Sequence, residues 1–236
     1  MAWLHGTTRT LVARLHRWAG LALGPLFVLL GLSGSLLVFY VELDERVEPA
    51  LAQALARPGT PAADAPWPPG WDTPRRAHPQ REGGWRIEIP PDPGEVLVTA
   101  RYLRPAETEG AFFAPLISTV DRRDASLVAD RFWGRTVMTW VYDLHFTLLL
   151  GEAGLWVVGT AGLLLALTLV GGTLLWWPRR GQAAAAWRVK RGAGAMRFWH
   201  DLHKIAGLGG GAVLLVLALS GTAMAVPAWI EPLVGA

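Results

Sequence analysis

Three long apolar runs interrupt the polar pattern of the chain and predict three membrane-spanning helices, at residues 15–41, 155–177 and 202–226. Each run is nearly free of charge and is long enough to cross a hydrocarbon core about 30 Å thick, which takes about 20 residues. Pro25 inside the first run is tolerated, because neighbouring helices can satisfy the backbone carbonyl that it frees. The first run is too long for the core of a signal peptide, so we interpret it as an uncleaved anchor.

The polar stretch between the first two spans predicts a small α+β domain. We expect a helix over residues 42–56, an irregular Pro-rich linker at 58–79 and a second helix at 136–150. Alternating apolar and polar positions between them predict four antiparallel strands, at Trp85–Ile89, Glu95–Tyr102, Ala111–Val120 and Ser126–Phe132. These strands carry too few apolar residues for a deep core, so the sheet is expected to lean on helices or on the membrane surface.

Charged residues near the ends of the spans predict the orientation. Bases cluster before the first span and between the second and third, whereas the first span ends in acids. Because cytoplasmic loops are enriched in Lys and Arg, the N-terminus is predicted to be inside and the C-terminus outside. The predicted fold class is a membrane α-helical protein with three transmembrane helices and a small α+β external domain. The expected segments are 1–41 (lead and first span), 42–135 (external domain), 136–178 (helix and second span), 179–201 (basic cytoplasmic loop) and 202–236 (third span and external tail).

An internal repeat relates the first span to the third. The stretch from His16 to Gly34 matches the stretch from His203 to Gly221, with the same offset of 187 residues at the matched histidine, glycine, leucine and serine positions. A register held over about 20 positions indicates a duplicated unit. The repeat predicts two parallel helices that each place a histidine at the same depth, at the cytoplasmic boundary.

A face of small residues follows each of these two histidines. Steps of three and four residues put several small residues on the same side of each span as its histidine. They are Gly20, Gly24, Gly31 and Gly34 after His16, and Gly207, Gly211, Ala218 and Gly221 after His203. Such a face suits close helix–helix packing. It equally leaves room for a flat macrocycle beside an imidazole that ligates it.

The composition narrows the chemistry open to these histidines. The chain has no cysteine, which excludes disulfides, Fe–S clusters and thiolate haem ligation. Two imidazoles from two helices suit a six-coordinate, bis-histidine haem b, so His16 and His203 are the candidate axial ligands. His200 is an alternative to His203 on the same side of the helix, but these two alone are too few for a zinc site. Nearby bases are candidates to neutralise the haem propionates: Arg14, Arg17, Arg197 and Lys204.

His145 is the candidate ligand of a second, external site. A haem at the cytoplasmic boundary is separated from an external substrate by about 30 Å of hydrocarbon, so an electron path needs a second carrier. The candidate partners of this histidine are Met138, Met224, His78 and the partner subunit's His145. The plainer alternative is an interfacial histidine that makes a hydrogen bond to Asp143 or to a backbone carbonyl.

Other function classes lack their signatures in this sequence. It contains no H-E-x-x-H, G-x-S-x-G, P-loop or dinucleotide-binding motif. The basic segment at 179–197 suits a topology signal that contacts lipid phosphates. No nucleic-acid partner is expected.

Several motifs resemble the PepSY-associated transmembrane family, whose bacterial inner-membrane members include periplasmic ferric-siderophore reductases. The similar segments are Leu15–Gly20, Leu144–Gly154, Trp176–Arg179, Leu202–Gly207 and the hairpin at 119–128. The resemblance implies haem b, a reduced PepSY-like external domain, and electron transfer from the inner to the outer face, usually to iron complexes. Longer members carry a further histidine on a fourth helix, so a homodimer or a partner membrane subunit is expected to complete any outer site here.

Two hypotheses follow. In the first, the chain is an inner-membrane haem b protein, with one haem or two, that carries electrons from a cytoplasmic or membrane donor to a periplasmic metal chelate such as a ferric siderophore. In the second, it is a cofactor-free membrane subunit whose periplasmic domain binds or regulates a partner protein, as PepSY domains in other settings are linked to protease inhibition. The glycine faces are then packing surfaces.

Overall fold

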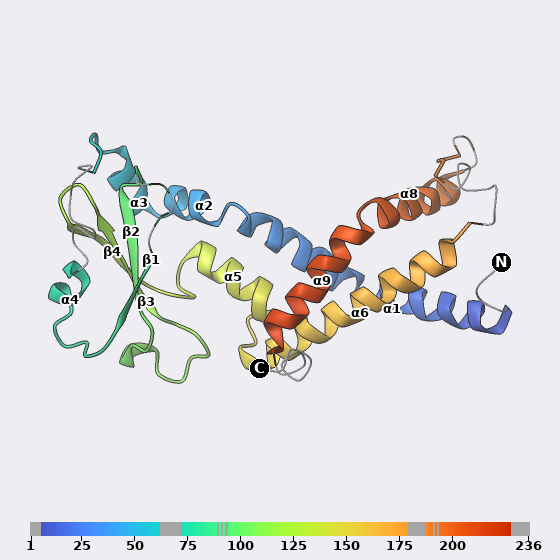
Figure 1. Cartoon of the computed structure of the whole chain (residues 1–236), viewed down its shortest axis with the longest axis horizontal. Helices are drawn as coiled ribbons and strands as arrows, with labels where there is room; N and C mark the ends of the chain where they lie inside the picture. Colours follow the sequence, from blue (N-terminus) through green and yellow to red (C-terminus); the bar gives the residue numbers. More distant parts are fainter. Residues whose placement is uncertain are drawn as a thin grey trace. The chain divides into compact units, whose positions relative to one another are not determined.

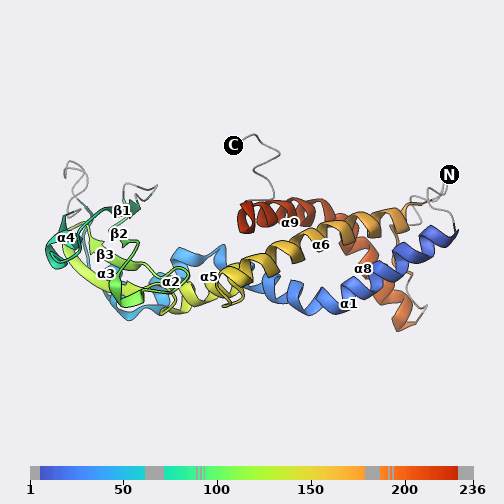
Figure 2. The ribbon, with the colours of Figure 1, turned by 90° about the horizontal axis from the view of Figure 1, so that it is seen from below.

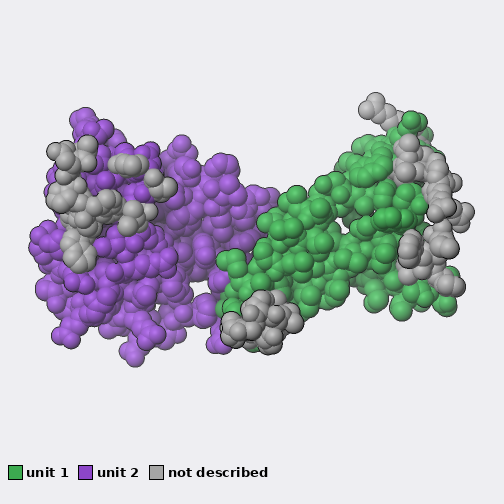
Figure 3. Space-filling view, in the orientation of Figure 1, with its two compact units in different colours: residues 1–29, 153–236 green, residues 30–152 purple. Residues whose placement is uncertain are grey.

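The computed structural model of the chain divides into two compact units (Figure 3). The helical unit comprises residues 1–29 and 153–236, and the sheet unit comprises residues 30–152. The described residues are 6–61, 72–88, 90, 92, 94–178, 187–190, 192 and 194–227. Parts of the predicted N-terminal lead, Pro-rich linker, basic loop and C-terminal tail lie outside the described residues.

The described residues of the helical unit form long helices, which Figure 1 labels. They are α1 (Gly6–Leu37, whose residues after 29 belong to the sheet unit), α6 (Glu152–Trp176), α8 (Ala195–Gly209) and α9 (Gly211–Ala225). α1 and α6 are each long and apolar enough to cross a membrane, and α8 with α9 passes the same test as one bent pair. The predicted membrane class is thereby confirmed. α1 is continuous through Pro25, starts before the predicted residue 15 and ends at Leu37, before the predicted 41.

α1 packs antiparallel to α6 within the helical unit. The Arg9 guanidinium donates to the Leu175 carbonyl at 3.3 Å, and about two turns further along α1 the His16 ring meets the Thr168 carbonyl at 3.1 Å. Because the order of the contacts on α6 is reversed relative to α1, the two helices run in opposite directions.

α9 packs on α6 through small residues, and it too runs antiparallel to α6 (Figure 2). The Thr222 hydroxyl donates to the Gly159 carbonyl at 3.1 Å, and a Cβ on Gly162 would collide with that hydroxyl. Close approach over glycines is the usual way in which helices pack in membranes. Since α1 and α9 are both antiparallel to α6, they run in the same direction, as the repeat predicts.

The third apolar run is a bent helix pair, which corrects the prediction of one uninterrupted span over 202–226. α8 begins at Ala195, and the two helices meet at Gly210 with a bend of 61°. Gly209, Gly210 and Gly211 are consecutive, and glycine lowers helix stability by about 1 kcal/mol relative to alanine. In the first copy of the repeat, Ala22 and Leu23 stand at the positions of Gly209 and Gly210, and glycine occurs only at Gly24, which matches Gly211. This difference explains why α1 is continuous there.

The sheet unit contains the four predicted antiparallel strands, paired in chain order. They are β1 (Trp85–Glu88), β2 (Leu97–Tyr102), β3 (Leu116–Asp121) and β4 (Ser126–Phe132). The predicted third strand was too long, because residues 111–115 form a loop that ends at Pro115, which has no N–H to donate to a ladder. A short 3₁₀ helix, η1 (Ala106–Thr108), precedes this loop.

Four helices accompany the sheet: α2 (Tyr40–Val47), α3 (Pro49–Ala56), α4 (Thr73–Ala77) and α5 (Val137–Thr147). The predicted single helix over 42–56 is wrong, because Glu48 takes an extended conformation (φ −91°, ψ 110°). Residues before proline avoid the helical region, and Pro49 follows directly. The linker at 58–79 is not irregular throughout, since α4 lies within it.

The sheet packs against these helices. Of the two expected supports, helices or the membrane surface, the helices are confirmed. α3 and α4 contact β4, and α4 also contacts β3. Leu51 of α3 is buried, as are Val98, Leu116 and Val120 of the sheet. Burying such side chains contributes about 1.5–3 kcal/mol each.

A cluster of ion pairs ties α3 to the turn between β3 and β4. The fully buried Asp121 carboxylate accepts from Arg123 at 2.6 Å and from Arg57 at 3.1 Å. Hydrogen bonds from Arg123 hold the pKa of Asp121 below its ordinary value. The Arg123 guanidinium also donates to the Ala54 carbonyl at 2.6 Å, so the turn and α3 are fixed to each other.

Candidate functional site

His16 is held against α6 by a contact that selects one of its two ring nitrogens. Its Nδ1 lies 3.1 Å from the Thr168 carbonyl oxygen. A carbonyl can only accept, so Nδ1 carries the proton and Nε2 keeps its lone pair. A metal-ligating histidine ordinarily has its second nitrogen bonded to a carbonyl or carboxylate in this way. This contact leaves Nε2 as the ring nitrogen through which His16 could bind a metal.

Gly172 forms the floor under the His16 ring. A Cβ at this position would lie 2.8 Å from His16 Cε1, closer than real Cβ contacts allow. Gly171 beside it is less constrained, because its Cβ would meet Val12 Cγ1 at an ordinary 3.5 Å. The absence of a side chain at Gly172 therefore sets the place of the imidazole.

His203 of α8 supplies the second imidazole. Its ring centroid lies 6.1 Å from that of His16, with the ring planes at 69°. Because a metal binds an imidazole nitrogen at about 2.0 Å, two rings on opposite sides of one metal ion have centroids about 6 Å apart. The spacing of the His16–His203 pair fits two axial ligands of one haem iron.

The two glycine faces beside this pair are open. Built Cβ atoms at Gly20 and Gly24 of α1, and at Gly207 and Gly211 at the α8–α9 bend, meet nothing within 4 Å among the described residues. By contrast, α6 uses Gly159 and Gly162 for tight packing. Among the described residues, no side chain fills the space beside these glycines, which leaves room for a macrocycle or for a partner helix.

The other predicted site residues of α8 have different surroundings. His200 is exposed over 67% of its side chain, and its Nδ1 lies 3.7 Å from Asp201. Lys204 and Arg197 both bind the buried Asp201 carboxylate, at 3.0 Å and 3.1 Å. These two bases are thus engaged within α8, whereas Arg17 is exposed on α1.

His145 of α5 is seated on α1 inside the sheet unit. Its Nδ1 lies 3.1 Å from the Ser33 hydroxyl, and a Cβ on Gly34 would lie 2.8 Å from its Cε1. Burial lowers the pKa of the His145 imidazole and so favours the neutral ring, the form that binds metals. The expected hydrogen bond to Asp143 is not the one observed, since that carboxylate accepts from the Trp133 indole at 2.8 Å.

No second ligand meets His145 within the described residues of the sheet unit. His78, one expected partner, binds Asp130 at 2.9 Å and stacks on Trp85. Met138, another expected partner, is buried. A search of the described residues also finds no cluster of three or more histidine, aspartate or glutamate side chains that would hold a bare metal ion.

Thr168, Gly172 and the Ser33–Gly34 pair are the supporting residues that sequence reasoning missed in these roles. Thr168 and Gly172 are four residues apart and so share one face of α6. This spacing was visible, but nothing in it indicated which histidine would pack there. Ser33 and Gly34 were noticed only as matched positions of the repeat, and their contact with a third helix needed the fold.

Comparison with known proteins places these features in a family. The model of the PepSY-associated TM region matches residues 13–236, a range that includes the whole sheet and all of the described helices except the first residues of α1. No curated protein matches the chain closely enough to lend it a function. On the extent of that match, the chain belongs to the PepSY-associated transmembrane family.

Proposed function

We propose that this protein binds haem b between His16 and His203 and carries electrons across a bacterial inner membrane to an acceptor such as a ferric siderophore or another metal chelate. The observation that carries the proposal is the centroid separation of 6.1 Å between the two imidazoles. The His16 tautomer and the open glycine faces support it independently. A haem iron held by two imidazoles supplies one-electron Fe(III)/Fe(II) chemistry without an open coordination position.

The chain's own residues have separate tasks in this proposal. The Thr168 carbonyl and Gly172 fix the orientation of the His16 ring, and His203 approaches from α8. Gly20 and Gly207 leave the space beside the rings free. Arg14 and Arg17 are exposed bases available to a propionate, whereas Lys204 and Arg197 are already bound to Asp201.

The absorption spectrum of the dithionite-reduced protein tests the proposal. Protein purified from haem-replete cells is expected to show bis-histidine haem b bands, and His16→Ala and His203→Ala are each expected to lower the haem-to-protein ratio by one. His200→Ala is the matched control, since this exposed histidine lies on the same helix, and it is expected to keep the parent ratio. A parent protein without haem bands would sink the proposal and favour the cofactor-free subunit. A ratio that neither substitution lowers would overturn the ligand assignment alone.

We also propose that the sheet unit is periplasmic and that the donor is cytoplasmic or membrane-bound. The charge distribution at the span ends supports this orientation. The chain has no cysteine, so single cysteines can report it cleanly. In intact spheroplasts, Glu82→Cys is expected to react with an impermeant maleimide and Arg188→Cys only after lysis. The reverse pattern would invert the orientation.

A second haem would need a partner for His145, and we propose a homodimer or another membrane subunit as its source. The Ser33 contact and the neutral ring support a ligand role for His145. A haem-to-protein ratio near two, falling to one in His145→Ala, is the expected result if such a partner is present. A ratio of one in both proteins would remove the second site.

A further inference from the structure

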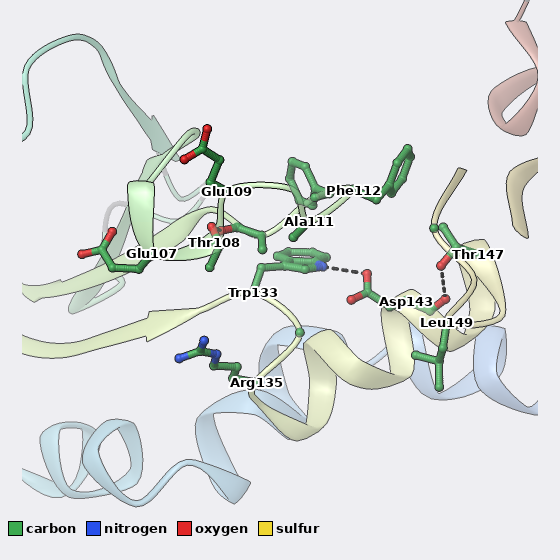
Figure 4. Close-up of a pocket in the computed structure, with 14 residues that line it drawn as sticks. Glu107, Thr108, Glu109, Ala111, Phe112, Trp133, Arg135, Asp143, Thr147 and Leu149 are labelled. Carbon is green, nitrogen blue, oxygen red and sulfur yellow. Dashed lines mark hydrogen bonds between the residues drawn. The ribbon is translucent and has the colours of Figure 1, made fainter. Parts of the chain in front are cut away.

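An open cleft of about 430 Å³ lies inside the sheet unit, apart from the histidine pair (Figure 4). Its walls come from the loop after η1, the turn after β4, one side of α5 and the turn between α5 and α6. Small-molecule sites commonly have volumes of about 300–1,000 Å³ and apolar walls with a few polar groups. The cleft has the size of a ligand site, and polar and apolar groups share its walls.

Two accessible aromatic rings line the cleft. Phe112 and Phe113 are exposed over 50% and 43% of their surfaces. Behind them Trp133 is buried, with its ring in edge contact with Phe113 at 5.1 Å. Exposed aromatic side chains in a concave surface offer faces on which a flat ligand can stack.

One carboxylate stands at the centre of the cleft without a cationic partner. Asp143 is half-buried and accepts the Trp133 indole N–H at 2.8 Å (Figure 4). No ion pair to Asp143 is found among the described residues. Arg135, the one base that lines the cleft, points away from Asp143 and lies over Phe132 at 5.0 Å. Glu107 and Glu109 also line the cleft, and Glu107 is paired with Arg81 at 2.6 Å.

The turn that closes the cleft is conformationally strained. Leu148 and Leu149 both have positive φ, at 52° and 61°, and Gly151 follows at 59°. Left-handed backbone is unusual for bulky residues and persists where the surroundings enforce it, often at binding sites. A Cβ on Gly151 would lie 3.2 Å from Phe112 Cβ, so the strained turn is packed against the aromatic wall.

We propose that this cleft is a binding site for a flat aromatic small molecule that is cationic, and that it discriminates against anions. The rings of Phe112 and Phe113 stack on the ligand, and the Asp143 carboxylate attracts its positive charge. An anionic chelate would be repelled by Asp143 and Glu109 with no base turned toward it. Aromatic faces beside a carboxylate recognise organic cations in this way.

The cleft and His145 use different sides of α5, because Asp143 contacts Trp133 whereas His145 contacts Ser33. An α-helix with its side chains is about 10 Å across, so an occupant would lie within a helix diameter of that imidazole. A role of the occupant as an electron acceptor rests on the proposed function. Binding itself does not depend on haem.

Isothermal titration of the full chain in lipid nanodiscs tests the site, with N-methylacridinium as the cation and anthracene-9-carboxylate as an anion of the same ring size. Titration into empty nanodiscs corrects for partition into lipid. The cation is expected to bind at least about tenfold more tightly than the anion, a ratio that one charged contact supplies. Equal affinities for the two probes would overturn the proposal.

Three variants locate the binding. Asp143→Asn keeps an acceptor for the Trp133 indole and is expected to weaken cation binding about tenfold. Phe112→Ala is expected to weaken it about threefold, and Glu109→Gln about twofold. Glu82→Gln, an exposed acid outside the cleft, is the matched control and should leave the affinity unchanged. Cation affinity that is the same in all four variants would place the binding elsewhere and refute the site.

The haem spectrum of the same samples separates this inference from the proposed function. Cation binding to protein that lacks haem bands would leave the cleft intact and sink the haem proposal. Haem bands in protein that does not bind the cation would refute the cleft as a cation site and leave the haem proposal intact.

Discussion

His16 and His145 lie in different units of the molecule and are held by the same kinds of contact. Each ring presses on a glycine of another helix, with a built Cβ 2.8 Å from Cε1 in both cases. Each also turns Nδ1 to an oxygen at 3.1 Å, the Thr168 carbonyl or the Ser33 hydroxyl. The difference is that His203 approaches the first ring, whereas no second ligand meets the other in the described part of its unit.

The fold can therefore hold an imidazole in one orientation without also supplying the second ligand that a complete metal site needs. A glycine packed against the ring and an oxygen bonded to Nδ1 fix the tautomer and orientation of the imidazole before any metal is bound. Ligation of a haem iron by two histidines needs, in addition, a second ring about 6 Å away. In the part of the chain that the structure describes, the His16–His203 pair alone has both.

Gly172→Ala should have the largest effect on the pair. The added methyl group would lie 2.8 Å from His16 Cε1, so the ring must move. Loss of support around a metal ligand costs about 10- to 100-fold in affinity, and haem retention during dilution is expected to fall by that factor. Gly171→Ala is the control, since its methyl group makes only an ordinary 3.5 Å contact. Equal losses in the two variants would mean that packing of α1 on α6, and not the ring, is affected.

Gly20→Leu tests the open face beside the pair and should have a smaller effect. No described atom lies within 4 Å of the built Cβ, so the protein itself should tolerate the larger side chain. Haem binding is expected to weaken about tenfold, because overfilling a well-packed site costs about 1–3 kcal/mol. Thermal unfolding of the haem-free protein supplies the control and should be unchanged. Unaltered haem binding would show that this face does not border the cofactor.

Ser33→Ala tests the contact that holds His145. Removing one neutral hydrogen bond to His145 is expected to lower the free energy of unfolding of the sheet unit by about 0.5–1.5 kcal/mol. The spectrum of the His16–His203 haem should not change. A loss of haem from this variant, measured as the haem-to-protein ratio, would instead reveal that His145 is a ligand and that the two regions are more alike than their local contacts indicate.

An acid titration separates the two regions without any effect at neutral pH. The folded-state pKa of Asp121 is below its ordinary value, so its stabilising contribution is complete above the unfolded pKa of about 3.9 and is lost as pH falls toward the folded pKa. The denaturation midpoint of the sheet unit is therefore expected to decrease below about pH 4. Asp121→Asn should flatten this dependence. A parent midpoint that is constant down to pH 3 would contradict the role of the ion-pair cluster.

Much of the fold was predictable because its signals are local. Apolar run length marks spans, period-two alternation marked all four strands, and the repeat predicted that α1 and α9 run in the same direction. Errors occurred where one residue overrides a pattern. Pro49 ends α2, Pro115 delays β3, and Gly210 bends the third run. Each of these was visible in the sequence but was outweighed by the apolar or alternating pattern around it.

The candidate site was predictable only in part. Two histidines at matched positions of a repeat are a sequence property, since a duplication carries its residue spacing with it. Which of His200 and His203 approaches His16 depends on the rotation of α8 about its axis. The Lys190 N–H, which donates to the buried Asp201 carboxylate at 3.2 Å, is a contact with α8 from outside the helix. The cleft beside Asp143 gave no sequence signal, because its walls come from four separate segments.

By itself, the sequence determined the membrane class, the order of the elements and the pairing of His16 with His203 as equivalent positions, because these depend on hydrophobicity and spacing along one chain. Only the tertiary structure decided that Gly172 lies under one ring and Gly34 under the other, and that Gly20, Gly24, Gly207 and Gly211 meet no described atom within 4 Å of a built Cβ. A glycine carries no side-chain signal of its own. Whether the space beside a glycine is occupied depends on which helix packs next to it.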